Sequence, residues 1–285
     1  RNGSLVKVWR GDALKGGTSA TLEASVPIVG GENRLTAYAF NRDNVKSSDA
    51  TFTVRGTQSK KGTLYVLAVG INNYANPQFD LKYAEPDARS FGEELQRQQQ
   101  RLNQYSRVEV ITLLDREATK TNILLAIKRL AGVDSTTPAT GVPQTLDRIK
   151  RAEPEDLVVI YFAGHGLADQ SRFYLIPHDI GYYGPRNREA ITADLKTVFG
   201  HGISDQELEG ELEGVDAARI VMVIDACHSG QALEAEEKRR GPMNSKGLAQ
   251  LAYEKGMYIL TAAQSYQAAL GSGRLGHGYL TYALI

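Results

Sequence analysis

Disulfides, long apolar segments and an excess of charge are all missing from this sequence. It has 1 cysteine in 285 residues, so no disulfide can form within the chain. Its 33 basic residues balance 33 acidic ones, so no bulk charge favours nucleic acid or a membrane surface as a partner. The longest apolar runs, 64–69 and 157–163, are too short to cross a bilayer. We therefore expect a globular protein in a reducing compartment, with the cytoplasm favoured and export left open.

The two ends of the sequence suggest part of a longer protein. It starts at Arg1 with no initiator methionine and stops at Ile285 inside an apolar run with helical spacing. We expect further domains, and any signal peptide, to lie beyond these ends. The length suffices for one large domain or two unequal ones.

Residues 1–56 lack a convincing helical pattern and show short alternating runs separated by glycine or polar turns. Alternation with period two predicts antiparallel strands with one buried face. These runs cover residues 4–9, 20–24, 33–40 and 50–54. The stretch 26–41 resembles the closing strands of bacterial immunoglobulin-like modules, and we expect an incomplete module of that kind. It would serve as a binding or targeting module, or as a spacer that braces the next domain.

A polar, glycine-bounded stretch at 57–62 has the composition of a linker, and the pattern changes after it. Buried, strand-like runs now alternate with segments of helical spacing around 88–102 and 123–131. This alternation predicts a mostly parallel sheet with helices on both faces, an α/β domain over residues 63–285. The predicted strands are 64–69, 108–114, 157–163, 219–225 and 257–261.

The ends of two predicted strands carry residues suited to nucleophilic catalysis. His165 lies between glycines after the third strand, and Cys227 follows the fourth. Because parallel strands end at the same edge of a sheet, the two side chains would share one crevice if the strands are neighbours. A histidine there could take the thiol proton and later protonate the leaving amine. Either residue alone would be better explained as ordinary packing, but their joint placement favours a catalytic pair.

The sequences Tyr-Phe-Ala-Gly-His-Gly at 161–166 and Asp-Ala-Cys-His-Ser-Gly at 225–230 resemble the two signatures of the caspase clan, specifically its metacaspase-like branch. Segments 64–74, 81–88, 257–263 and 277–282 resemble other parts of that family in the same order, so the resemblance covers roughly residues 63–285. It implies a caspase-like fold and a cysteine endopeptidase. His165 would be the base and Cys227 the nucleophile, and the amides of Gly166 and Cys227 would form the oxyanion hole.

The resemblance also implies where the substrate binds. Asp87 and Asp225 match the acidic residues of the first substrate pocket in metacaspases, with Ala163 beside them. Two carboxylates in a partly desolvated pocket suit a guanidinium, so we expect polypeptide substrates with Arg, then Lys, at the cleaved position. Alternative roles remain for both acids: Asp225 as a strand-end cap, and Asp87 as a residue favoured at a helix N-terminus.

Other polar segments carry weaker signals. The charged stretch 236–246 matches a linker that this clan often cuts during activation, so Arg240 and Lys246 are candidate self-cleavage sites, although a solvated loop explains the stretch equally well. Asp179, Asp194 and Glu234 fall near places where some metacaspases hold calcium, but the family's paired aspartates are not reproduced. We therefore expect no metal site and no cofactor, with calcium as the alternative.

Two other readings of the α/β domain stay open at this point. The fold could act without catalysis, as a scaffold or signalling module. It could also bind a nucleotide or phosphate, but the first strand runs into Gly-Ile-Asn-Asn-Tyr at 70–74, which is not a phosphate loop.

Overall fold

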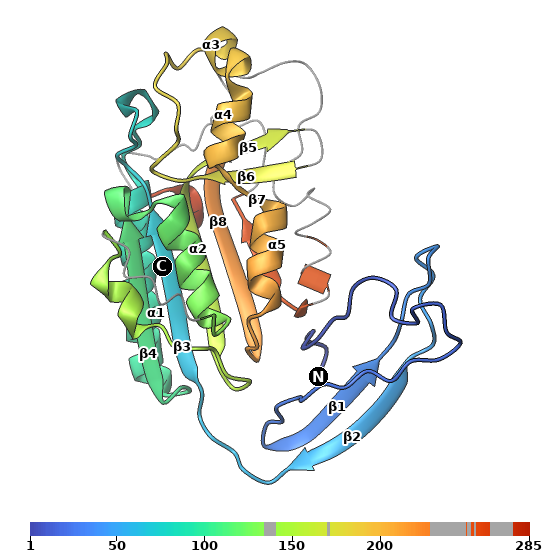
Figure 1. The fold of residues 1–285 in the computed structure, drawn as a ribbon. Helices are drawn as coiled ribbons and strands as arrows, with labels where there is room; N and C mark the ends of the chain where they lie inside the picture. The colour runs from blue at the N-terminus through green and yellow to red at the C-terminus, as the bar shows by residue number, and fades with distance from the viewer. Residues whose placement is uncertain (134–140, 170–171, 229–248, 250–251, 254, 263–275) are drawn as a thin grey trace.

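The computed structural model describes residues 1–133, 141–169, 172–228, 249, 252–253, 255–262 and 276–285. Its centre is a sheet in which five parallel strands follow one another in the order β4, β3, β5, β8, β9 (Figure 1). Their bounds are Thr63–Gly70 for β3, Arg107–Leu114 for β4, Leu157–Asp169 for β5, Arg219–His228 for β8 and Tyr258–Thr261 for β9. The α/β fold predicted from the alternation of strand and helix patterns is confirmed.

Helices cover both faces of this sheet, and two separate apolar clusters fill the space beneath them. On one face, α2 (Lys120–Leu130) and α5 (Asp205–Glu213) pack over the larger cluster. On the other, α1 (Ala84–Leu102) and α7 (Tyr279–Leu284) pack over the smaller one. Strand β3 is buried along almost its whole length, as expected for a central parallel strand with helices on both sides.

The helix starts are fixed by local hydrogen bonds. The Thr119 side chain accepts from the amide of Asn122 at the start of α2. Ser204 and Glu207 form a reciprocal capping box at the start of α5. These caps satisfy backbone amides that have no partner within the helix, and they fix the residue at which each helix begins.

An antiparallel extension beyond the parallel strands was not predicted from the sequence. The second half of β5 pairs with β6 (Arg172–Ile176), and β6 pairs with the short β7 (Ile203–Ser204). Helices α3 (Arg188–Ala193) and α4 (Leu195–His201) lie between β6 and β7 along the chain. Short 3-10 turns cover Pro77–Phe79 (η1), Asp115–Glu117 (η2) and Gln144–Arg148 (η3).

The N-terminal segment forms a two-stranded antiparallel sheet of β1 (Gly31–Ala37) and β2 (Ala50–Gly56). The strands predicted at 4–9 and 20–24 are wrong, because neither run pairs with another strand in the structure. Their alternating side chains are mostly exposed, so there is no buried face for the alternation to serve. The ribbon of Figure 1 shows β1 and β2 to one side of the main sheet.

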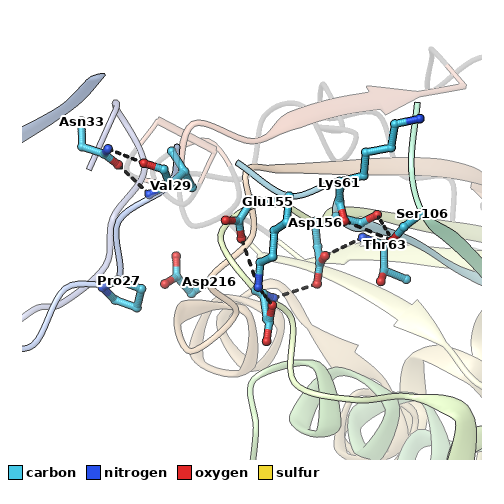
Figure 2. Close-up of polar contacts among 12 residues, drawn as sticks. Pro27, Val29, Asn33, Lys61, Thr63, Ser106, Glu155, Asp156 and Asp216 are labelled. Carbon is cyan, nitrogen blue, oxygen red and sulfur yellow. Dashed lines mark hydrogen bonds and ion pairs between the residues drawn. The ribbon is translucent and has the colours of Figure 1, made fainter. Parts of the chain in front are cut away.

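Polar contacts hold the N-terminal segment and residues 57–62 against the α/β domain, and Figure 2 shows those around Thr63 and Asp156. The Arg1 guanidinium donates to the Pro27 carbonyl at 2.7 Å and pairs with Asp216 at 2.6 Å. The backbone amide of Thr63 donates to Asp156 Oδ1 at 2.6 Å, at the point where β3 begins. Lys60 pairs with Glu153 from within the expected linker. The segment is therefore tied to the amino-terminal edge of the sheet, opposite the strand ends that carry His165 and Cys227.

Candidate active site

The loop that follows β3 is held in one shape by carboxylates. Asp115 accepts the backbone amides of Asn72 and Asn73 at 2.7 and 2.9 Å. Asp80 accepts the amide of Tyr74 at 2.8 Å. The side chain of Asn76 then begins the η1 turn by accepting from the amide of Gln78. These bonds fix the loop so that its last turn faces the end of β5.

His165 lies on β5 against this loop and is almost fully buried, with 2% of its surface exposed. Its Nε2 is 2.7 Å from the carbonyl oxygen of Phe79 in η1. A carbonyl only accepts, so Nε2 carries the proton and Nδ1 presents a lone pair. Within the described part of the chain, Nδ1 is a buried polar atom with no hydrogen-bond partner. The hydrogen bond of Nε2 therefore orients the ring of His165, while the hydrogen-bonding capacity of Nδ1 is unused among the described residues.

Aromatic rings and a buried hydroxyl surround His165. Its ring centroid lies 4.9 Å from that of Tyr74 and 6.0 Å from that of Phe79. The Tyr74 hydroxyl accepts the backbone amide of His165 at 2.8 Å. Burial in this pocket lowers the pKa of His165 to about 4, against the opposing effect of the Phe79 carbonyl, so the imidazole is neutral at pH 7.

Cys227 lies directly beside His165, because the register of β5 and β8 pairs the two residues. Neighbouring strands are about 4.8 Å apart. The side chain of Cys227 lies outside what the structure describes, as does that of His228. What the structure gives is the backbone juxtaposition that the sequence argument required: two neighbouring parallel strands, with the histidine and the cysteine side by side near their carboxyl ends.

Gly166 follows His165 in β5 and is opposite His228 in β8. A Cβ at this position would lie 2.8 Å from the ring of Phe173 and 3.2 Å from Cβ of Ala226. A side chain does not fit here without movement of its neighbours, so the glycine allows the close packing of three strands beside Cys227.

The two predicted pocket acids are brought together around Gly278. Asp87, on α1, is 2% exposed and Asp225, on β8, is 9% exposed. An ideal Cβ at Gly278 would lie 3.0 Å from Oδ2 of Asp87 and 3.1 Å from Oδ2 of Asp225. Ala163 pairs with Asp225 in the sheet register, and it is itself buried. Residues far apart in sequence therefore form one acidic cluster on the face of the sheet covered by α1 and α7.

Donors from the start of α7 bind this acidic pair. His277 Nδ1 is 2.6 Å from Asp87 Oδ1, and the amide of Gly278 donates to Asp87 Oδ2 at 3.0 Å. The Thr281 hydroxyl donates to Asp225 Oδ2 at 2.8 Å and accepts from the Tyr161 hydroxyl at 2.5 Å. Among the described residues, neither carboxylate forms an ion pair with lysine or arginine.

Burial dominates the electrostatics of both acids. It raises the pKa of Asp87 and that of Asp225 above their ordinary values, in spite of the hydrogen bonds that favour the charged forms. The charge of Asp225 adds to the rise in the Asp87 pKa, which is a further sign that the two groups are close. A pair of acids without a resident lysine or arginine is suited to receive a cation.

Several partners of these residues were missed by the sequence analysis. Thr281, Tyr161 and the Phe79 carbonyl act through tertiary contacts across 56, 120 and 86 residues of chain. His277 lies in the segment 277–282, which the sequence analysis gave only as part of the family resemblance. Thr281 does occur in the segment that resembles the family, but nothing in its local pattern distinguishes it from an ordinary helical residue.

Asp179 and Asp194 do not join this site. Asp179 accepts the amide of Lys120, and Asp194 accepts the hydroxyl of Thr197. Arg240, Lys246 and Glu234 lie outside the described residues. In the described ranges, no group of three or more histidine, cysteine or acidic side chains is arranged to hold a metal ion. Nor does any helix there have the length and apolar character to span a membrane.

Residues 63–285 match the model of the family described as the caspase domain, and the chain belongs to that family. Membership supports cysteine-type peptidase activity in general. A solved structure with some likeness is the crystal structure of protein GSU0716 from Geobacter sulfurreducens, at 18% identity and a TM-score of 0.37. The match covers 59% of this chain and 51% of that one, so this chain spans about half the length of that structure. A search of curated proteins gave no match.

Proposed function

We propose that the chain is a metacaspase-like cysteine endopeptidase that cleaves peptide bonds after Arg or Lys. The observation that carries this proposal is the buried Nδ1 of His165, which has no hydrogen-bond partner among the described residues and lies on a strand whose register pairs His165 with Cys227. A buried polar atom without a partner costs free energy, so its retention calls for an explanation. A proton acceptor for a neighbouring thiol supplies one.

The chemistry would proceed in two stages. In the first, Nδ1 of His165 takes the proton of the Cys227 thiol while the sulfur attacks the substrate carbonyl carbon. The protonated imidazole then gives this proton to the leaving amine, the peptide C–N bond breaks, and a thioester remains on Cys227. In the second, His165 takes a proton from water, the resulting hydroxide attacks the thioester, and the thiol is restored with that proton.

The Phe79 carbonyl would act in this scheme as an orienting group. It fixes the tautomer of His165 and favours the protonated ring that forms during attack, because it accepts from Nε2 throughout. Burial disfavours that cation, which keeps the resting imidazole neutral. The amides of Gly166 and Cys227 are the proposed donors to the oxyanion.

The acidic pair supports the proposed specificity. Asp87 and Asp225 lie on the same face of the sheet, and Cys227 is two residues beyond Asp225 on β8. This spacing along one strand supports a pocket close to the backbone of the proposed nucleophile. A guanidinium or ammonium group of the substrate would balance the negative charge of this pair, which has no lysine or arginine partner among the described residues.

A peptide series with a fluorogenic leaving group after Arg, Lys, Asp or Ala tests both parts of this proposal. We expect cleavage after Arg and Lys, little after Ala and none after Asp, and complete loss in Cys227→Ala. Cleavage after Asp would contradict the pocket assignment and leave the catalytic pair intact. A folded wild-type chain that cleaves none of the peptides would indicate the catalytically silent scaffold.

Self-processing within residues 236–246 is the finer part of the proposal. An enzyme that prefers basic residues would cut after Arg240 or Lys246, and no cofactor is needed for such a cut. Intact-mass spectrometry after incubation should show these fragments for the wild type and an uncut chain for Cys227→Ala. An uncut wild-type chain with proven peptidase activity would remove this part alone.

The proposal extends to partners and location. Polypeptides are the expected substrates, and neither nucleic acid nor a membrane is expected as a partner. The N-terminal segment would belong to an immunoglobulin-like module and would brace the peptidase domain through Arg1 and Asp216, and the protein would be cytoplasmic.

A further inference from the structure

Residues 277–281, which lead into α7 and form its start, supply most of the hydrogen bonds made by the acidic pair. Asp87 uses both oxygens on this segment, Oδ1 with His277 and Oδ2 with the Gly278 amide. Asp225 is bound by Thr281, which lies within α7. The pocket proposed to receive a substrate side chain therefore already holds groups from the protein's own chain.

His277 differs from the other donors because it is the one side chain here that can also carry a positive charge. It is also the accessible member of the contact, since its side chain is 22% exposed while that of Asp87 is 3% exposed. The half-buried ring already occupies Oδ1 of the more deeply buried Asp87. An arriving basic side chain would have to share Asp87 with this ring or displace it.

We infer that His277 is a specificity-determining residue of this pocket, which sets how strongly Arg is preferred over Lys. The inference rests on the proposed function and deepens it. An ammonium group is a compact charge that is satisfied by one accessible carboxylate. A guanidinium presents a planar fork of donors and gains most from acceptors that are open in a matching geometry. While His277 is hydrogen-bonded to Oδ1 of Asp87, that oxygen is not open to the guanidinium, so Arg gains less from the pocket than it otherwise would.

Removal of the ring should therefore favour Arg more than Lys. In His277→Ala, Oδ1 of Asp87 loses its donor and is left buried, a state that is unfavourable until a substrate supplies the missing hydrogen bond. In His277→Gln, the side-chain amide is neutral but still able to donate to Oδ1. The glutamine variant should thus lie between the alanine variant and the wild type.

The test compares kcat/KM for two peptides that differ only in Arg or Lys at the cleaved position. We expect the Arg-to-Lys ratio to rise about tenfold in His277→Ala and about threefold in His277→Gln, where a tenfold change corresponds to roughly 1.4 kcal/mol. His201→Gln is the matched control, because His201 is exposed and bonds to the Asp179 carbonyl, and its ratio should equal that of the wild type. Ratios within twofold of the wild type in both His277 variants would overturn the inference.

A binding measurement separates this inference from the proposed function. Calorimetric titration of Cys227→Ala, alone and combined with His277→Gln, would use peptides that end in Arg or Lys. A wild-type chain that cleaves nothing, together with a binding ratio that shifts toward Arg in the double variant, would refute catalysis and support the role of His277. Cleavage after Arg and Lys with an unchanged ratio refutes the inference alone. Absence of both cleavage and binding refutes the two together.

Discussion

Replacement of Thr281 by valine tests the network that holds the pocket acid on β8. The threonine is fully buried, and its hydroxyl links the Tyr161 hydroxyl to Oδ2 of Asp225. Valine has nearly the same shape but neither donates nor accepts, so Asp225 loses one donor while its hydrogen bonds from Tyr161 and the Thr281 backbone remain. The loss of one hydrogen bond to a charged group costs about 1.5–3 kcal/mol, and we expect about 1.5 kcal/mol for Thr281→Val because the other donors stay. At ~2–4 °C per kcal/mol for a domain of this size, the melting temperature should fall by roughly 3–6 °C.

Thr281→Ser is the matched control, because serine keeps the hydroxyl and loses one methyl group. Its cost should be about 0.8 kcal/mol, the value of one buried methylene. Thermal unfolding followed by circular dichroism measures both variants, and KM for an Arg substrate should rise in the valine variant because Asp225 is no longer fixed. A valine variant that melts within about 1 °C of the wild type, or a serine variant that loses as much as valine, would refute this account of the network.

Three further changes test other parts of the structure. Because burial raises the Asp225 pKa above its ordinary value of 3.8, the charged carboxylate destabilises the fold at neutral pH, and this effect fades as pH falls through the raised pKa toward 3.8. Asp225→Asn should therefore have a higher melting temperature than the wild type at pH 8, and this difference should shrink toward pH 4. The variant should also lose cleavage after Arg. A difference in melting temperature that grows on acidification would contradict this prediction. Gly166→Ala should cost about 1–3 kcal/mol of stability, because its Cβ would lie 2.8 Å from the nearest ring carbon of Phe173. Gly210→Ala is the control and should cost nothing, because there is open space around Gly210. Equal melting temperatures for the two variants would count against tight packing at the end of β5. Asp216→Ala should lower the free energy of unfolding by about 3 kcal/mol in chemical denaturation, because it leaves the buried Arg1 guanidinium without its anion. An unchanged unfolding transition would mean that this contact does not hold the N-terminal segment.

The sequence was sufficient to predict the main sheet because burial and strand pattern coincide there. Strands β3, β4, β5, β8 and β9 were each predicted within a few residues, apart from the extended end of β5. Long runs of apolar residues are typical of parallel strands covered on both faces, and no tertiary detail is needed to recognise them. The rule that parallel strands end at one edge predicted that His165 and Cys227 lie at the same edge, whereas their placement on neighbouring strands came from the structure.

The N-terminal strands failed for the opposite reason. The runs at 4–9 and 20–24 alternate, but alternation predicts a strand only where one face has something to pack against. In the structure none of their side chains is fully buried, and the strands that pair are β1 and β2, with one further bridge between Phe40 and Lys46. The β6–β7 extension was missed because its short strands depend on β5 and on each other, which no local pattern records.

The hydrogen-bond partners of His165 and Asp225 could not be predicted from the sequence either. A backbone carbonyl such as that of Phe79 has no sequence signature, and a hydroxyl such as that of Thr281 is common in helices. Their effect depends on a fold that brings distant segments together. The acids themselves were found through the family resemblance, whereas their shared donors from α7 could be assigned only from coordinates.

The central claim, a nucleophilic Cys227 beside a cation-accepting pocket, is tested most directly by covalent labelling. A peptide acyloxymethyl ketone with Arg at the reactive position should add one acyl-methyl group to the wild-type chain, located by mass spectrometry on Cys227, with the carboxylate as leaving group. The account predicts no adduct in Cys227→Ala, slow labelling in His165→Ala, and little labelling by the same reagent with Asp in place of Arg. Rapid labelling of the wild type that is indifferent to His165, or equal labelling by the Asp reagent, would contradict it.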